Sequence, residues 1–176
     1  MLEHATALVL EVGVSGFTID ELAKRSGVAK TTIYRHFPTR NELLVAALDG
    51  QIPTPDTPDT GTFRGDLVAF LTSLVQIFED EAIRMVSLDL LALGAREPDI
   101  TKHFRALASD RSTPLDTMIE RGRRRGEVRD DLDPLTLLEL IEGPMFMRSL
   151  MRPDQIGDFD IESHVDGVVQ VAGPTG

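Results

Sequence analysis

Six polar side chains between Lys30 and His36 could donate hydrogen bonds from one short stretch of chain. Lysine and arginine supply charged donors, threonine and tyrosine supply hydroxyls, and histidine supplies a ring nitrogen. Donors of these kinds can hold phosphate oxygens, and Arg, Lys and Thr can also recognise the edges of bases in a DNA groove. The six residues are Lys30, Thr31, Thr32, Tyr34, Arg35 and His36.

Apolar residues at helical spacing must position these donors. Ile33 and Phe37 lie one turn apart and would form the inner side of a helix. A shorter helix precedes it, with Thr18 as a favourable N-cap. Gly27 lies between the two helices and suits a turn that needs a positive φ angle. Residues 18–37 therefore predict a helix-turn-helix, a motif whose second helix enters the major groove of DNA.

The same segment resembles a known family. Residues 27–37 read GVAKTTIYRHF, and RNELL follows at 40–44. This pattern is similar to the DNA-binding domain of TetR-type transcriptional regulators, where a Thr-Ile-Tyr-x-His-Phe core is followed by a basic residue, Glu and two Leu. The resemblance implies contacts with operator DNA by Thr18, Lys30, Thr31, Thr32, Tyr34, His36 and Arg40.

Side-chain chemistry adds Arg35 to this set and suggests two roles. Four of the residues suit phosphates: Thr18, Tyr34, His36 and Arg40. Thr18 does so because it lies at a helix N-terminus, where free N–H groups also bind phosphate. The residues expected near base edges are Lys30, Thr31, Thr32 and Arg35. The alternative is that one or two of the eight only cap a helix or remain in solvent.

The distribution of charge supports contact with nucleic acid through a small area only. The formal net charge is −11, and residues 51–176 hold 13 basic and 23 acidic residues. Between Glu21 and Glu42 there is no acid but five cations, so this segment alone forms a basic patch. An acidic remainder would repel DNA, and so few phosphate contacts imply a moderate, salt-sensitive affinity per subunit.

The rest of the chain predicts helices throughout, so the fold class is all-α. Residues 1–50 form the three-helix DNA-binding domain with its following helix, and the Pro-, Thr- and Asp-rich residues 51–62 form a linker loop. Residues 63–172 carry long apolar helical patterns, including a segment at 83–95 that is apolar nearly all round and should be central in this domain. By resemblance, 63–172 is a ligand-binding and dimerisation bundle.

A second basic run, within residues 121–129, has two interpretations. It is the densest group of arginines in the chain and could be a further DNA site. It also follows a helix end and has acids at 127, 130, 131 and 133 beside it. A solvated junction paired with those acids is the better interpretation.

The predicted bundle should hold both a subunit interface and an effector. The resemblance implies a homodimer, because two neighbouring apolar helices near the C-terminus usually form the subunit interface in this family. Here they lie at 135–151 and 159–171 and would form a four-helix contact, and a two-fold dimer suits a palindromic operator. An unknown small-molecule effector, apolar or amphipathic, is the second expected partner. The candidate pocket residues are Phe70, Leu74, Phe78, Met85, Leu88, Leu91, Phe104, Leu107, Met118, Met145 and Phe146.

Other classes of function find little support. The chain has no Cys and no G-x-S-x-G, G-x-x-x-x-G-K, G-x-G-x-x-G or H-E-x-x-H motif, so neither an enzyme, nor a cofactor, nor a metal site is expected. It has no membrane-length apolar run and no signal-peptide pattern, which favours the cytoplasm.

The prediction is therefore a homodimeric repressor that a small effector releases from a palindromic operator. The alternative is a helical sensor or binding protein without operator affinity. The acidic total keeps this alternative open, as does the lack, in the given sequence, of the basic segment that relatives usually carry before the first helix. Either the chain is trimmed at its start or the protein lacks those phosphate contacts.

Overall fold

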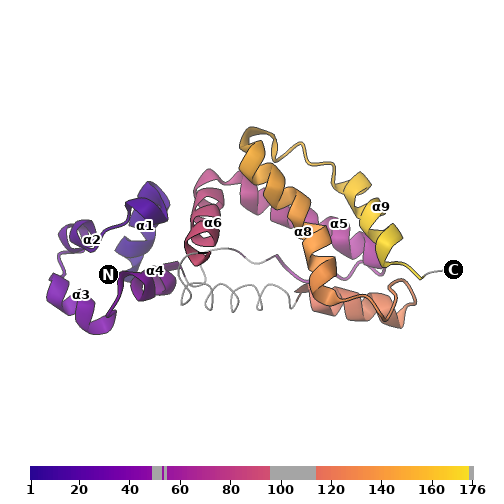
Figure 1. Cartoon of the computed structure of the whole chain (residues 1–176), viewed down its shortest axis with the longest axis horizontal. Helices are drawn as coiled ribbons and strands as arrows, with labels where there is room; N and C mark the ends of the chain where they lie inside the picture. The colour runs from indigo at the N-terminus through magenta and orange to yellow at the C-terminus, as the bar shows by residue number, and fades with distance from the viewer. Residues whose placement is uncertain (49–52, 54, 96–113, 175–176) are drawn as a thin grey trace. The chain divides into compact units, whose positions relative to one another are not determined.

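The computed structural model describes residues 1–48, 53, 55–95 and 114–174, which form α-helices joined by short turns with no strand among them. The chain divides into two compact units. The first contains α1 to α4 together with α6, and the second contains α5, the helical residues 114–124, α8 and α9 (Figure 1). The predicted all-helical fold is confirmed.

The first unit is built around a cluster of buried aliphatic side chains. Its helices are α1 (Leu2–Gly16), α2 (Ile19–Ser26), α3 (Lys30–His36), α4 (Arg40–Leu48) and α6 (Glu81–Gly94). Leu22, Ile33 and Leu44 are fully buried in this cluster, and Phe37 packs against it. The apolar residues of the hairpin thus face inward, as their spacing predicts.

The predicted caps of the hairpin are present. The Glu21 N–H donates to Oγ1 of Thr18 at 3.2 Å, so Thr18 is the N-cap of α2. Gly27 has a φ of 69° in the left-handed region and separates α2 from α3. Thr39 caps α4 in the same way, by accepting from the Glu42 N–H at 3.1 Å.

Helix α1 is interrupted near its end. Gly13 has a φ of 73° and a ψ of 169°, so it leaves the helical conformation before α1 finishes at Gly16. A positive φ is unfavourable for residues with a Cβ, which explains a glycine at this point. The break directs the chain into the short connection that leads to Thr18 and α2.

Helix α6 differs from the expectation for residues 83–95. Its buried residues Val86 and Leu90 join the cluster of the first unit, where α6 packs on α1. The apolar pattern of the segment is satisfied in this way rather than in the core of the second unit. The predicted domain boundaries at 50 and 63 stay a prediction.

The second unit has an aromatic and aliphatic core. It contains α5 (Phe63–Glu79), α8 (Pro134–Met151), the 3-10 turn η1 (Pro153–Gln155) and α9 (Ile161–Ala172), with α5, α8 and α9 in mutual contact (Figure 1). Asp133 caps α8 by accepting from the Thr136 N–H at 2.8 Å, and Pro134 occupies the first helical position. Asp160 caps α9 through the Ser163 N–H.

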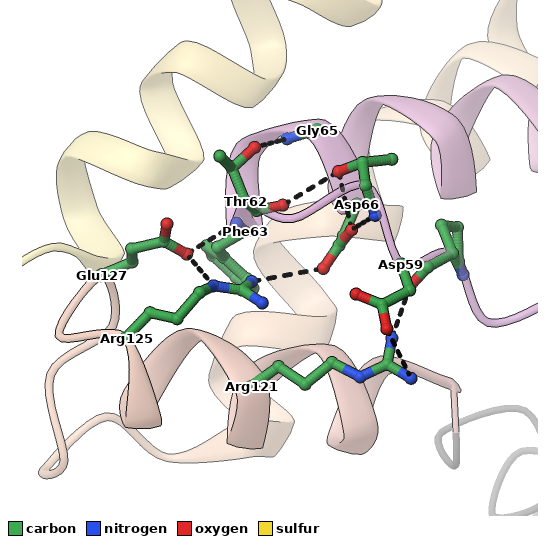
Figure 2. Close-up of polar contacts among 10 residues, drawn as sticks. Asp59, Thr62, Phe63, Gly65, Asp66, Arg121, Arg125 and Glu127 are labelled. Atoms are coloured by element: carbon green, nitrogen blue, oxygen red, sulfur yellow. Dashed lines mark hydrogen bonds and ion pairs between the residues drawn. The ribbon is translucent and has the colours of Figure 1, made fainter.

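A polar network joins the start of α5 to the helix end at 121–127 (Figure 2). The Asp66 carboxylate is fully buried and accepts from the Thr60 N–H at 2.7 Å and from its hydroxyl at 2.8 Å. Arg125 lies 3.4 Å from Asp66 through Nη2 and 2.9 Å from Glu127 through Nε. Glu127 also accepts from the Phe63 N–H at 2.7 Å.

The arginines of 121–129 are largely paired in this way. Arg121 donates to the Pro58 carbonyl at 2.7 Å and lies 3.6 Å from Asp59. Arg123 donates to the Leu132 carbonyl, and Arg129 lies 3.4 Å from Asp131. Pairing with the neighbouring acids is thus confirmed for Arg125 with Glu127 and Arg129 with Asp131, whereas Arg121 and Arg123 have partners outside the predicted acids. The solvated junction and the second DNA site both stay predictions.

Candidate nucleic-acid interface

Helix α3 presents most of the predicted donors to solvent. Thr31, Tyr34, Arg35 and His36 are exposed, and Tyr34 retains 48% of its accessible surface. Within the described part of the chain these four side chains make no hydrogen bond or ion pair. Thr32 is half-buried on the same helix. The donors of α3 are therefore available to a partner while Ile33 anchors the helix from behind.

Lys30, the first residue of α3, already has an anionic partner. Its Nζ lies 2.7 Å from Oδ1 of Asp20 on α2, and both side chains are mostly exposed. A pair of this kind is weak in water, since solvent screens both charges. Lys30 can therefore exchange Asp20 for a phosphate or a base edge at little cost.

The other cations near α3 carry less free charge than the sequence suggests. Arg25 lies 3.0 Å from Glu21 and also bonds Glu11 of α1. The hydrogen bonds that Arg25 donates to Glu11 and Glu21 raise the pKa of Arg25, and Arg25 in turn lowers the pKa of Glu11. Lys24 lies 3.9 Å from the same Glu21. The basic patch of five cations is therefore partly neutralised by acids that precede it in the chain.

Arg40 turns inward rather than toward solvent. Its Nε donates to the Phe17 carbonyl at 3.1 Å, one Nη donates to the Val14 carbonyl, and the guanidinium lies 5.9 Å from the centre of the Phe17 ring. Partial burial lowers the pKa of Arg40, although a guanidinium remains charged at neutral pH. Contact with phosphate by Arg40 stays a prediction.

Thr18 is exposed at the start of α2 and near Arg40. Its Oγ1 accepts from the Glu21 N–H, which leaves the hydroxyl proton able to donate to a phosphate. Thr18, Tyr34 and Arg40 share the wall of an open cleft of about 690 Å³ with Asp20 and Asp89. The carboxylates make the interior of this cleft unsuitable for a phosphate, so contact with DNA is expected on its rim.

The predicted effector residues separate into two groups. Phe70, Leu74, Phe78, Met118 and Met145 are each at most 3% exposed and lie together in the core of the second unit. Phe146 packs against this core and makes an edge-to-face contact with Phe78, with the ring centres 5.1 Å apart. The structure therefore brings six of the candidates together.

The remaining candidates do not join this group. Met85 is 49% exposed on α6, and Leu88 is half-buried on the same helix, which belongs to the first unit. Phe104, Leu107 and the side chain of Leu91 lie outside the described residues. The core around Phe78 is thus the part of the prediction that retains structural support.

Comparison with protein families assigns the chain. The model described as "Bacterial regulatory proteins, tetR family" matches residues 1–47, and the model described as "Tetracyclin repressor-like, C-terminal domain" matches residues 57–168. The chain belongs to the TetR family. It is a DNA-binding transcriptional regulator, and the resemblance noted in residues 27–44 is confirmed.

Individual relatives agree with this assignment. The "Uncharacterized HTH-type transcriptional regulator YdeS" of Bacillus subtilis is 28% identical over 160 residues, which cover 90% of this chain and 80% of the relative. The crystal structure of the TetR family regulator SCO0332 shares the fold, with a TM-score of 0.71 at 24% identity over 98% of this chain and 96% of that one. FadR from Bacillus subtilis in complex with stearoyl-CoA gives a TM-score of 0.70 at 18% identity, over 97% of this chain and 94% of that one.

Two carboxylates near α3 in this TetR-family regulator have contacts that the sequence does not predict. Asp20 pairs with Lys30, and Asp89 accepts from the Val14 N–H at 2.9 Å. Neither contact has a local signal, because Asp20 is ten residues from Lys30 and Asp89 is 75 residues from Val14. In the described part of the chain, no cluster of His, Asp and Glu could hold a metal ion, and no helix combines the length and apolar composition needed to cross a bilayer.

Proposed function

We propose that this TetR-family regulator is a homodimeric repressor, working in the cytoplasm, that binds a palindromic operator through α3 and leaves it when a small molecule enters the second unit. The row of exposed donors on α3 carries the proposal. Its side chains offer hydroxyl, ring-nitrogen and guanidinium donors on a helix whose opposite side is buried. An α-helix of this kind fits the major groove, which presents a distinct pattern of acceptors for each base pair.

The proposed contacts follow from the exposure of each side chain. Tyr34 and His36, in the last turn of α3, would hold phosphates together with Thr18 at the start of α2. The residues proposed to face the bases are Lys30, Thr31, Thr32 and Arg35. We leave Arg40 out of the primary contacts, because its Nε and one Nη already donate to backbone carbonyls.

Selection of DNA by the purified chain tests operator binding. Duplexes enriched from a random-sequence library should contain an inverted repeat, and footprinting should show protection of matching sites upstream of the gene. The control is the chain with Thr31, Tyr34 and Arg35 replaced by alanine, which should keep its fold because all three side chains are exposed. Failure of the wild-type chain to enrich any duplex at low salt would favour the alternative, a sensor without operator affinity.

Helix α8 supports the proposed homodimer. Four of its large apolar side chains are between 60% and 69% exposed in the single chain, an uncommon arrangement unless another surface covers them. They are Leu135, Met147, Leu150 and Met151. A two-fold axis beside α8 would bury them against the same residues of a second copy and would give the symmetric pair of heads that a palindrome needs.

Size-exclusion chromatography with light scattering tests this interface. The wild-type chain should elute as a dimer, and the double variant Met147→Glu and Leu150→Glu as a monomer, since four carboxylates would otherwise be buried at the contact. Leu2→Glu with Leu10→Glu is the matched control, because it places two acids at exposed apolar positions of α1. A wild-type monomer at micromolar concentration would contradict the proposal.

The core around Phe78 supports an apolar effector. Its neighbours are aromatic, aliphatic or thioether side chains, which favour an acyl or ring system over a polar metabolite. A structural neighbour, FadR, is known with stearoyl-CoA bound. Thermal unfolding with and without a long-chain acyl-CoA is therefore the first screen. We expect the acyl-CoA to raise the Tm of the wild-type chain and to release the selected duplex. Met118→Glu should abolish the rise in Tm.

A further inference from the structure

The backbone of Val14 is bonded on both sides by charged side chains from other helices. Its N–H donates to Oδ2 of Asp89 on α6 at 2.9 Å, and its carbonyl accepts from the guanidinium of Arg40 on α4. Val14 itself is only 2% exposed. Because Gly13 breaks the helix just before it, the N–H of Val14 depends on a partner from outside α1.

The same guanidinium extends the contact along the chain. Arg40 also donates to the Phe17 carbonyl at 3.1 Å, immediately before the Thr18 cap of α2. The connection of residues 14–17 is thus held by an anion on one side and a cation on the other. Hydrogen bonds to charged partners are roughly twice as strong as neutral ones, so they fix this connection firmly.

The glycine at position 13 indicates how closely Asp89 approaches. A Cβ at Gly13 would lie 2.9 Å from Oδ2 of Asp89, in addition to the strain of its positive φ. The carboxylate therefore occupies the space that a side chain would need. Aliphatic contacts through Val86 and Leu90 also hold α6 on α1, but such contacts are not directional and do not determine the position of one N–H.

We propose that Asp89 is a positioning residue for DNA binding: with Arg40 it clamps the connection of residues 14–17 and so orients the α2–α3 hairpin relative to α1. Asp89 lies outside residues 1–47, so the segment that resembles a complete DNA-binding domain requires a side chain of α6 for its geometry. Loss of the carboxylate leaves the Val14 N–H without an acceptor, and the connection then samples orientations that place α3 wrongly.

The test compares Asp89→Ala and Asp89→Asn with Leu90→Ala in the full chain. Leu90 is 3% exposed and belongs to the same cluster, so its truncation weakens packing and leaves the clamp intact. The probe is the duplex that the wild-type chain enriches from a random library, measured by fluorescence anisotropy well below each variant's Tm. Hydrogen–deuterium exchange of residues 13–18 in the free protein reports the clamp directly.

Asp89→Ala should weaken binding about tenfold and raise deuterium uptake at 13–18, because an orphaned buried N–H carries a penalty of that order. Asp89→Asn retains an oxygen acceptor and should bind within about threefold of wild type. Leu90→Ala should lower Tm by more than Asp89→Ala yet bind within about twofold. Asp89→Glu keeps the charge but displaces the carboxylate. Its affinity for the duplex should lie between those of Asp89→Asn and Asp89→Ala.

Three results would overturn the proposal. The first is wild-type binding by both Asp89→Ala and Asp89→Glu, and the second is unchanged exchange at residues 13–18 in Asp89→Ala. The third is a loss of affinity that follows Tm equally in the Asp89 and Leu90 variants. The inference uses the proposed operator binding only for its probe. If the wild-type chain enriched no duplex, the proposed function would fail, while exchange at residues 13–18 would still decide whether Asp89 holds the connection.

Discussion

Lys30 and Asp20 form an ion pair across the turn of the hairpin, with Nζ of Lys30 2.7 Å from Oδ1 of Asp20. The pair joins the first residue of α3 to the first turn of α2. It places an acid beside the surface that would meet phosphates. We therefore expect Asp20 to oppose DNA binding in two ways, by occupying Lys30 and by repelling the DNA backbone.

Asp20→Asn should strengthen binding to the selected duplex up to about fivefold at low salt, since exposed ion pairs contribute at most about 1 kcal/mol. The gain should shrink as salt is added, because both effects are electrostatic. Anisotropy titrations at several salt concentrations measure it. Asp130→Asn removes one exposed acid from the second unit and is the matched control. Weaker binding by Asp20→Asn would contradict this role.

Tyr34→Ala should weaken binding to all DNA sequences alike. The side chain is 48% exposed and is proposed to hold a phosphate, a group that is the same at every base pair. Tyr34→Phe removes only the hydroxyl and should lose most of the affinity that Tyr34→Ala loses. Affinities for a panel of mutated duplexes provide the measurement. A changed base preference with intact affinity would show that Tyr34 contacts a base instead.

Gly13→Ala should destabilise the first unit more than Gly27→Ala. Both positions have a positive φ, of 73° and 69°, so both substitutions carry strain of about 1 kcal/mol. Only at Gly13 would the new methyl meet a neighbour, Oδ2 of Asp89, whereas nothing lies within 4 Å at Gly27. Urea unfolding of the two variants measures the difference. Combining Gly13→Ala with Asp89→Ala should remove part of the excess, since the clash is then absent.

Asp66→Ala should lower the free energy of unfolding by about 3 kcal/mol, because it leaves the Thr60 N–H and Arg125 without their buried acceptor. Asp59→Ala is the control. Asp59 pairs with Arg121 at 3.6 Å with a mostly exposed side chain, so its loss should change stability by less than about 1 kcal/mol. Equal effects in chemical denaturation would show that the network of Figure 2 does not depend on burial.

Acid should weaken the caps of α8 and α9. Hydrogen bonds from Thr136 lower the pKa of Asp133, and those from Ser163 lower the pKa of Asp160, both from 3.8. Because both values are depressed in the folded state, the stabilisation is complete well above pH 3.8 and is lost as the pH falls through the lower folded values. Unfolding curves between pH 3 and 7 measure it. Asp133→Asn with Asp160→Asn should flatten this part of the pH dependence, since Asn caps without titrating in this range.

Local patterns were sufficient for most of the fold. Thr18, Gly27 and Asp133 predict where helices begin or turn, because caps and positive φ angles depend on residue type at one position. The outward direction of Tyr34 and Arg35 also follows, since Ile33 and Phe37 fix which side of α3 is buried. These features need only a few neighbouring residues.

Contacts between distant residues could not be predicted in this way. The number of cations in residues 22–41 overstates the free positive charge of the basic patch. In the folded chain Arg25 pairs with Glu11 and Glu21. Lys30 pairs with Asp20. The motif predicts a phosphate contact for Arg40, but it gives no sign that Nε and one Nη of Arg40 donate to the carbonyls of residues 17 and 14. The apolar pattern of α6 predicts that the helix is buried, but it does not predict that α6 packs on α1.

The pairing of arginines within 121–129 also affects how this regulator would find a site on a chromosome. Sliding and hopping along DNA depend on attraction to phosphates that is independent of sequence. Because four of the five arginines of 121–129 lie beside carboxylates of the same unit, we expect this run to add little to that attraction. We therefore expect short residence on ordinary DNA and rapid exchange between segments, so that occupancy of the operator depends on base recognition by α3.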